Sequence, residues 1–297
     1  MARIGHMAGT LPRLNAFTVD LEDWFQGLTS TNPLVEQWPY FESRVVLATT
    51  LLLDILRRHK IQATFFTLGY VAARYPALIE TISADGHDIG LHGYFHRHTS
   101  QLTPDEFSQE LERNIQAIEL ITGDRPLGYR APYFSVDAAT LWTLDLLEAQ
   151  GICYDSSFFP TRNLLYGFPT APRFPHRPDG HTLVEFPLST VRLGGLNWPI
   201  AGGFYLRSWP YPFIRWGISR LNAQGQPAIM YIHPWELDLG QRYDRVTLRE
   251  RITHYHGRRQ LEGKLERLFT DFRFGSLRAL FEQYQYLRQE ALDRGCP

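Results

Sequence analysis

The feature that most constrains the fold is a regular alternation of short β-type runs with helical patterns in the first half of the chain. The apolar runs predict strands at 16–20, 63–67, 87–92, 127–130 and 152–155. Helical spacing and capping signals predict helices at 45–58, 75–84, 103–123 and 138–150. A repeated strand–helix rhythm favours an α/β fold with a parallel sheet and helices outside it.

The rhythm is interrupted at 160–210, which is rich in Pro and Gly and predicts an irregular insert that includes a short strand at 182–186. It resumes with a helix at 211–223 and a strand at 228–233, and further helices are expected at 258–271 and 277–294. We therefore expect a main domain over 14–238. Residues 1–13 would be an N-terminal extension or a cloning remnant, and 239–297 a C-terminal extension that packs on the barrel.

Composition narrows the class of protein. The chain has 297 residues and a formal net charge of −1, so no broad basic field favours a nucleic-acid partner. Its two cysteines, Cys153 and Cys296, make neither a disulfide framework nor a cysteine metal site. The N-terminus lacks a signal-like apolar run, and no stretch is apolar enough to span a membrane. These features predict a cytoplasmic protein.

Three carboxylates, Asp20, Glu22 and Asp23, stand at the end of the first predicted strand. Carboxylates this close repel one another and are stabilised by a cation or a proton. Strand alternation places Asp20 and Glu22 on one face and displaces Asp23. The alternative, a solvated loop start or a helix cap, is equally compatible with this segment alone.

Histidines gather after the third predicted strand, where His92 and His96 are four residues apart. Neutral imidazole is the commonest metal-binding side chain, although a lone histidine is more often structural. Together with one carboxylate of the acidic cluster, the pair would form a 2-His-1-carboxylate set with open positions for water and substrate.

Two further strand ends carry reactive side chains. Arg130 and Tyr133 follow the fourth predicted strand, and an arginine there could hold a carboxylate ionised. His233 ends a late strand and is a candidate general acid. Taken singly, each is as compatible with a structural role: a surface arginine before a proline turn, or a histidine that closes the barrel.

In their order along the chain, these motifs resemble the polysaccharide deacetylase family (NodB homology, carbohydrate esterase family 4). The segments VDLEDWF, LGYRAPYFS, YDSSFFP, APRFPHR, EFPLST, YIHPWELD and DFRFGSL are similar to an exosortase/PEP-CTERM-associated branch that occurs in exopolysaccharide gene clusters. This resemblance implies a distorted (β/α) barrel that binds a divalent metal ion, most often Zn²⁺.

The resemblance also implies roles for particular residues. Asp20 matches the catalytic base, Arg130 the residue that orients it, and His233 the general acid. His92 and His96 match the metal-binding histidines. The backbone N–H near Tyr133 would stabilise the oxyanion.

The chain departs from the common pattern of two adjacent aspartates, because here the segment is Asp20-Leu21-Glu22-Asp23. The third metal ligand is therefore open between Glu22 and Asp23. Pro132, Trp198 and Trp235 are candidate substrate-binding residues.

These expectations describe a hydrolase that removes acetyl groups, foremost N-acetyl groups, from a glycan of exopolysaccharide biosynthesis. Its partners would be the acetylated glycan and the biosynthetic machinery, with no nucleic acid and no integral membrane segment. Two alternatives remain: a cyclic-amide hydrolase of the allantoinase type on the same scaffold, and a glycan-binding protein without catalysis.

Overall fold

The structure is a computed structural model that describes residues 13–28, 33–163, 167–241 and 246–293. Its main sheet contains β1 (Asn15–Leu21), β2 (Thr64–Thr67), β3 (Asp88–Leu91), β4 (Gly128–Tyr129), β5 (Tyr154–Asp155), β6 (Val184–Glu185), β9 (Ile229–Ile232) and β10 (Phe274–Gly275). Every pair in this sheet is parallel. Each strand predicted from the sequence is present, and β4, β5 and β6 are only two residues long.

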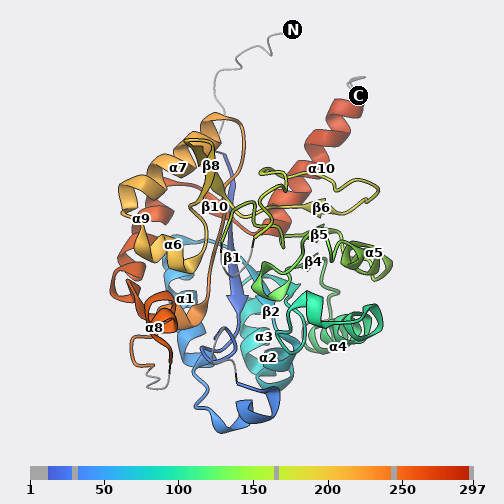
Figure 1. Cartoon of the computed structure of the whole chain (residues 1–297), viewed down its shortest axis with the longest axis vertical. Coiled ribbons are helices and arrows are strands. Elements are labelled where there is room, and N and C mark those ends of the chain that lie inside the picture. The colour runs from blue at the N-terminus through green and yellow to red at the C-terminus, as the bar shows by residue number, and fades with distance from the viewer. Residues whose placement is uncertain (1–12, 29–32, 164–166, 242–245, 294–297) are drawn as a thin grey trace.

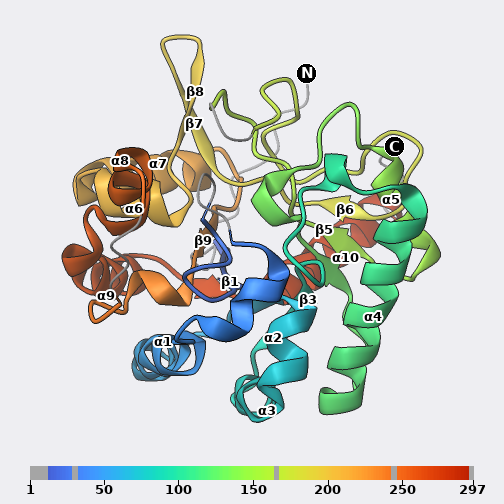
Figure 2. The same ribbon diagram turned by 60° about the horizontal axis from the view of Figure 1, so that its bottom comes forward.

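The strands curl into an open barrel in the order β9-β1-β2-β3-β4-β5-β6. The gap between β6 and β9 is bridged by Ser189, which donates its backbone N–H to Ile229 O (3.3 Å) and accepts the Ile229 N–H at Oγ (2.7 Å). Helices cover the outer face of the sheet, as Figures 1 and 2 show. The expected distorted (β/α) barrel is confirmed.

The predicted helices are α1 (Val45–His59), α3 (Pro76–Ala84), α4 (Pro104–Thr122), α5 (Trp142–Ala149), α7 (Tyr211–Ala223), α9 (Leu261–Asp271) and α10 (Leu277–Asp293). The capping box of α4 is present, because Thr103 Oγ1 accepts the Glu106 N–H and Glu106 Oε2 accepts the Thr103 N–H. Helix α5 begins later than predicted. The side chains of Asp137 and Thr140 bond to nearby backbone N–H groups and hold a turn where the helix was expected to start.

Several short elements were not predicted: α2 (Gly69–Arg74), α6 (Gly203–Ser208), α8 (Leu248–Glu250), a π-turn at Arg251–Tyr255, and 3₁₀ turns at Val35–Tyr40, Thr99–Gln101, Pro132–Phe134 and Pro234–Glu236. The first residues of the helix predicted at 258–271 form a 3₁₀ turn, Arg258–Gln260, directly before α9. The insert also contains an antiparallel hairpin of β7 (Thr190–Leu193) and β8 (Leu196–Pro199). Elements of one or two turns carry too little periodicity to stand out in a sequence.

The C-terminal segment is part of the barrel core. Strand β10 pairs with the first two residues of β1, and β2 pairs with the last four residues of β1. The Phe17 ring on β1 meets the rings of Phe269 (4.9 Å) and Phe274 (6.2 Å) in edge-to-face contacts. The segment thus completes the sheet as well as packing on it. Cys296 lies outside the described residues.

Across the described ranges, the helices lack the combination of length and apolar character that crossing a bilayer requires.

A candidate metal centre and active site

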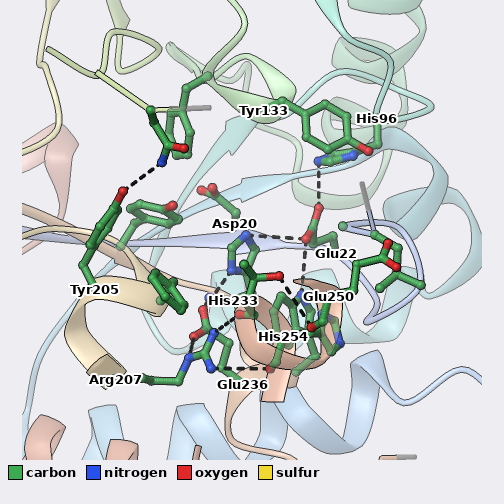
Figure 3. Close-up of a pocket in the computed structure, with 18 of the residues that line it drawn as sticks. Asp20, Glu22, His96, Tyr133, Tyr205, Arg207, His233, Glu236, Glu250 and His254 are labelled. Atoms are coloured by element: carbon green, nitrogen blue, oxygen red, sulfur yellow. Dashed lines mark hydrogen bonds and ion pairs between the residues drawn. The ribbon is translucent and has the colours of Figure 1, made fainter. Parts of the chain in front are cut away.

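The predicted site residues converge on a cavity of about 530 Å³ at the C-terminal ends of the parallel strands, the end where (β/α) barrels carry their active sites. Its lining includes Asp20, Glu22, His92, His96, Tyr133, His233 and Trp235. Asp20 and Glu22 both face the cavity, as strand alternation predicts. Figure 3 shows Glu22 between His96 and His233.

Glu22, His92 and His96 form a buried cluster in which one potential ligand atom from each residue lies within 4.8 Å of the other two. Glu22 Oε2 is 2.8 Å from His96 Nε2. The chain turns sharply between the two histidines, with Gly93 (φ +69°) and His96 (φ +53°) in the left-handed region. This conformation is costly for a non-glycine residue and is typical of functional sites.

The donor set fits a divalent cation. His92 Nδ1 lies 2.8 Å from Arg130 O, and because a carbonyl only accepts, Nδ1 carries the proton and Nε2 keeps its lone pair. Burial, followed by the charge of His96, holds the pKa of His92 well below its ordinary value, so the imidazole is neutral. Burial favours the neutral acid at Glu22, but the charges of His96 and His233 outweigh it and lower the Glu22 pKa.

Asp23 does not join this cluster. Its carboxylate accepts hydrogen bonds from the Ser43 hydroxyl and from the backbone N–H groups of Trp24 (2.9 Å), Arg44 (3.1 Å) and Val45 (3.4 Å). It therefore caps the start of α1, the alternative left open for these acids. Glu22 is the carboxylate that the geometry offers to a cation, and the expectation of Asp23 as a ligand is corrected.

Asp20 is held by Arg130, as expected. Arg130 Nη1 lies 2.6 Å from Asp20 Oδ1 and 2.8 Å from Thr18 Oγ1. Its Nε and Nη2 donate to the backbone oxygen (3.0 Å) and hydroxyl (2.8 Å) of Ser156. Because the guanidinium is fully buried and bonded at each nitrogen, it fixes the carboxylate in position.

His233 is oriented by a residue that the sequence did not single out. Its Nδ1 and its backbone N–H both lie 2.9 Å from Glu236 Oε1. Glu236 Oε2 is bound in turn by Arg207 of α6. Burial disfavours the imidazolium, but the charges of Glu22 and Glu236 outweigh it and raise the pKa of His233 to about 9.

Asp155, an acid at another strand end, does not line this cavity. It is buried on β5 and accepts a hydrogen bond from Ser157 Oγ (2.6 Å). The acid that orients His233 is Glu236. The spacing His233-x-x-Glu236 was a usable signal, because residues three apart in a tight turn can face each other.

The three candidate substrate-binding residues, Pro132, Trp198 and Trp235, do not all line the cavity. Trp235 lines the cavity and donates its indole N–H to Glu22 Oε1 (3.2 Å). Trp198 lies outside it on the β7–β8 hairpin, and Pro132 packs beneath Gly93 without lining it. Both are corrections. Tyr133 lies on the cavity wall with its ring against His96 (4.4 Å) in a left-handed backbone conformation (φ +56°).

Much of the cavity wall comes from residues that were not predicted to contribute. The insert supplies Arg162, Asn163, Phe204, Tyr205 and Arg207, and the C-terminal segment supplies Arg249, Glu250, Thr253 and His254. The His254 ring stacks on Trp235 at 3.9 Å with the two planes 10° apart. No local sequence pattern predicted that these residues line the cavity, because they reach it only through tertiary packing.

Comparison with known families divides the chain in two. Residues 40–152 match the model of the family described as polysaccharide deacetylase. Residues 156–282 match a domain of unknown function, DUF3473. The second match contains His233 and most of the unpredicted cavity wall.

Known proteins similar to the chain include a peptidoglycan deacetylase-like protein, FGM2, from Gibberella zeae. It is 37% identical over 124 residues, or 40% of this chain and 36% of that protein. A peptidoglycan-N-acetylglucosamine deacetylase from Bacillus cereus is 28% identical over 166 residues, or 48% of this chain and 59% of that protein. The chain therefore spans about a third to three fifths of the length of these two relatives.

A solved structure of a Mycobacterium smegmatis protein, provisionally assigned as a polysaccharide deacetylase, superposes with a TM-score of 0.63 over 94% of both chains at 21% identity. This likeness establishes the fold. Residues 40–152 are thus similar to the polysaccharide deacetylase family, and the structural likeness concerns the fold alone.

Proposed function

We propose that the protein is a metal-dependent hydrolase that removes acetyl groups, foremost N-acetyl groups, from a glycan. One observation carries the proposal. Glu22, His92 and His96, which could together hold a cation, line the same cavity as Asp20, the partner of Arg130, and His233. Hydrolysis of an amide needs an activated water, a base and an acid, and these side chains can provide all three functions.

When bound, a divalent cation would supply Lewis acidity and lower the pKa of water at the cluster. Asp20, held by Arg130, would accept the proton of the attacking water. His233, whose Nδ1 is occupied by Glu236, would donate a proton from Nε2 to the leaving amine. The backbone N–H of Tyr133 is the proposed donor to the developing oxyanion.

The residues that form the cavity wall limit the size of the substrate that we propose. The insert and the C-terminal segment both contribute to the wall, which favours a short or terminal glycan unit over a long polymer threading an open groove. We further propose Zn²⁺ as the metal and an intermediate of exopolysaccharide biosynthesis as the substrate. The latter rests on the resemblance of the motif segments to the exosortase-associated branch.

Acetate release from N-acetylglucosamine oligomers by the zinc-loaded protein tests the proposal, with Asp20→Asn as the matched inactive variant. Release by the wild type alone supports it. Binding of the oligomers by both proteins without acetate release would instead favour the glycan-binding alternative.

A cyclic-amide hydrolase remains a second candidate, because insert residues such as Asn163 and Tyr205 form part of the cavity wall. Allantoin hydrolysis in the absence of acetate release would select it.

A further inference from the structure

The β7–β8 hairpin carries an apolar surface that the proposed hydrolysis does not use. Its turn, Gly194-Gly195, has both residues at positive φ (59° and 81°), as tight hairpins with a primed turn require. The two leucines that flank the turn, Leu193 and Leu196, are paired across the strands and are 49% and 62% exposed. Figure 2 shows the hairpin projecting beyond the body of the protein.

The apolar face continues from the hairpin onto α7. Antiparallel pairing puts Val191, Leu193, Leu196 and Trp198 on one face of the hairpin, with Val191 anchored in the core. From Trp198, ring contacts run in a ladder: Trp198–Trp209 (5.9 Å), Trp209–Phe213 (5.2 Å) and Phe213–Trp216 (5.6 Å, stacked). Trp198 and Trp216 are both more than a third exposed, so aliphatic and aromatic side chains form one surface.

The segments that carry this surface also contain arginines, with Arg192 on the opposite face of the hairpin beside its pair Asn197. Between residues 186 and 235 the sequence has four arginines and neither Asp nor Glu. Of these, Arg207 is bonded to Glu236 and Arg215 to Asp271, whereas Arg192 and Arg220 form no ion pair with any described residue. Arg173, which is bonded to Thr190 of β7, is close enough that burial and then the charges of Arg192 and Arg220 lower its pKa.

We propose that the hairpin tip and the exposed face of α7 dock on an anionic membrane surface. Aliphatic side chains on a projecting tip suit insertion among lipid acyl chains, and tryptophan and arginine beside them suit the headgroup region. The uncompensated arginines complement anionic headgroups. A glycan explains this surface less well, because leucines at the tip offer no hydrogen bonds to sugar hydroxyls.

The docking surface is linked to the proposed active site. Next to Leu196 on β8, Asn197 Nδ2 donates to Pro160 O (2.9 Å), and Thr161 Oγ1 donates to Asn197 O (3.2 Å). The next two residues, Arg162 and Asn163, line the cavity, as do Phe204 and Tyr205 of α6, which follows β8. Docking would therefore hold the cavity near the membrane, within reach of a membrane-attached glycan.

Co-sedimentation tests the proposal, using the full chain with vesicles of phosphatidylcholine alone or mixed with equal parts of phosphatidylglycerol. The wild type is expected to sediment with the anionic vesicles and to be released by high salt. The double change Leu193→Ser/Leu196→Ser should weaken binding about tenfold by removing inserted apolar area. Arg192→Gln and Arg220→Gln should each weaken it about fivefold.

The matched control is Leu120→Ser, which changes a leucine that is 88% exposed on α4, away from the hairpin. It should bind vesicles as the wild type does, and circular dichroism should show the same melting temperature for the hairpin variants as for the wild type. Equal binding by the wild type and the hairpin variants would overturn the proposal. So would binding to soluble polygalacturonate without binding to either vesicle, which would assign the surface to glycans.

Discussion

The two sides of the cavity are built in different ways. On one side, Glu22, His92 and His96 come from the ends of β1 and β3, and each lies beside the strand that positions it. On the other side, His233 is held by Glu236, which is held by Arg207, which also donates to the backbone oxygens of Thr253 (2.8 Å) and His256. The first side is local to the barrel, and the second depends on the insert and the C-terminal segment.

This difference separates what each half contributes. His92 and His96 lie within the match to the polysaccharide deacetylase model over residues 40–152, and Glu22 lies before it. The region that matches the domain of unknown function contains His233 and its support. We therefore expect changes at Glu22, His92 or His96 to abolish metal binding and activity together, and changes at His233 or its supporting residues to lower activity while metal stays bound.

The largest effect is expected for His96→Ala. Removing this imidazole leaves Glu22 and His92 with two donors, too few for a stable site, so acetate release should fall to background. Acetate release from N-acetylglucosamine oligomers at saturating zinc measures the loss. Activity within a fewfold of wild type would show that the cluster is not the catalytic centre.

Asp20→Asn should lower kcat by about 10²- to 10⁴-fold, the usual contribution of a general base. The amide keeps the shape of the side chain but cannot accept the proton. Zinc content should stay at the wild-type level, because Asp20 is not among the clustered donors. Loss of zinc in this variant would mean that Asp20 is a metal ligand, so that it could not be assigned to the role of general base alone.

Glu236→Gln tests the other side and should lower kcat by about 10- to 100-fold, the scale found for groups that orient a reacting histidine. The amide can still accept from His233 but cannot neutralise the buried Arg207, so some loss of stability is also expected. Parallel measurement of kcat, zinc content and melting temperature separates the effects. Retained zinc with reduced kcat is the predicted pattern, and zinc loss contradicts it.

Asp23→Asn should have the smallest effect. It weakens the capping of α1 and is expected to lower the free energy of unfolding by about 1 kcal/mol. Because Asp23 lies outside the cluster, zinc content and kcat should remain near wild type. Denaturant unfolding and metal analysis check this prediction, and a selective loss of zinc would restore Asp23 as a ligand.

The sequence predicted the barrel and the metal side of the cavity because their signals are local. Asp20 lies on β1 and Glu22 follows it by two residues, just past the strand end, and a short spacing brings His92 and His96 together once the chain turns. It could not choose between Glu22 and Asp23, because the deciding contacts come from Ser43 and Arg44.

The residues that hold His233 could not be predicted from the sequence for the same physical reason. Arg207 meets Glu236 across 29 residues and the backbone oxygen of His256 across 49. Such contacts depend on how the insert and the C-terminal segment pack, and that packing leaves no periodic pattern in either segment. Trp198 misled because an aromatic residue in a Pro- and Gly-rich insert is as compatible with an exposed hairpin as with a sugar groove.

The central claim, that Glu22, His92 and His96 hold a divalent cation, is tested most directly by elemental analysis of the purified wild type and His92→Ala after reconstitution with zinc. We expect stoichiometric zinc in the wild type and its loss in the variant, with both proteins folded by circular dichroism. Zinc in neither protein, or in both equally, would contradict it.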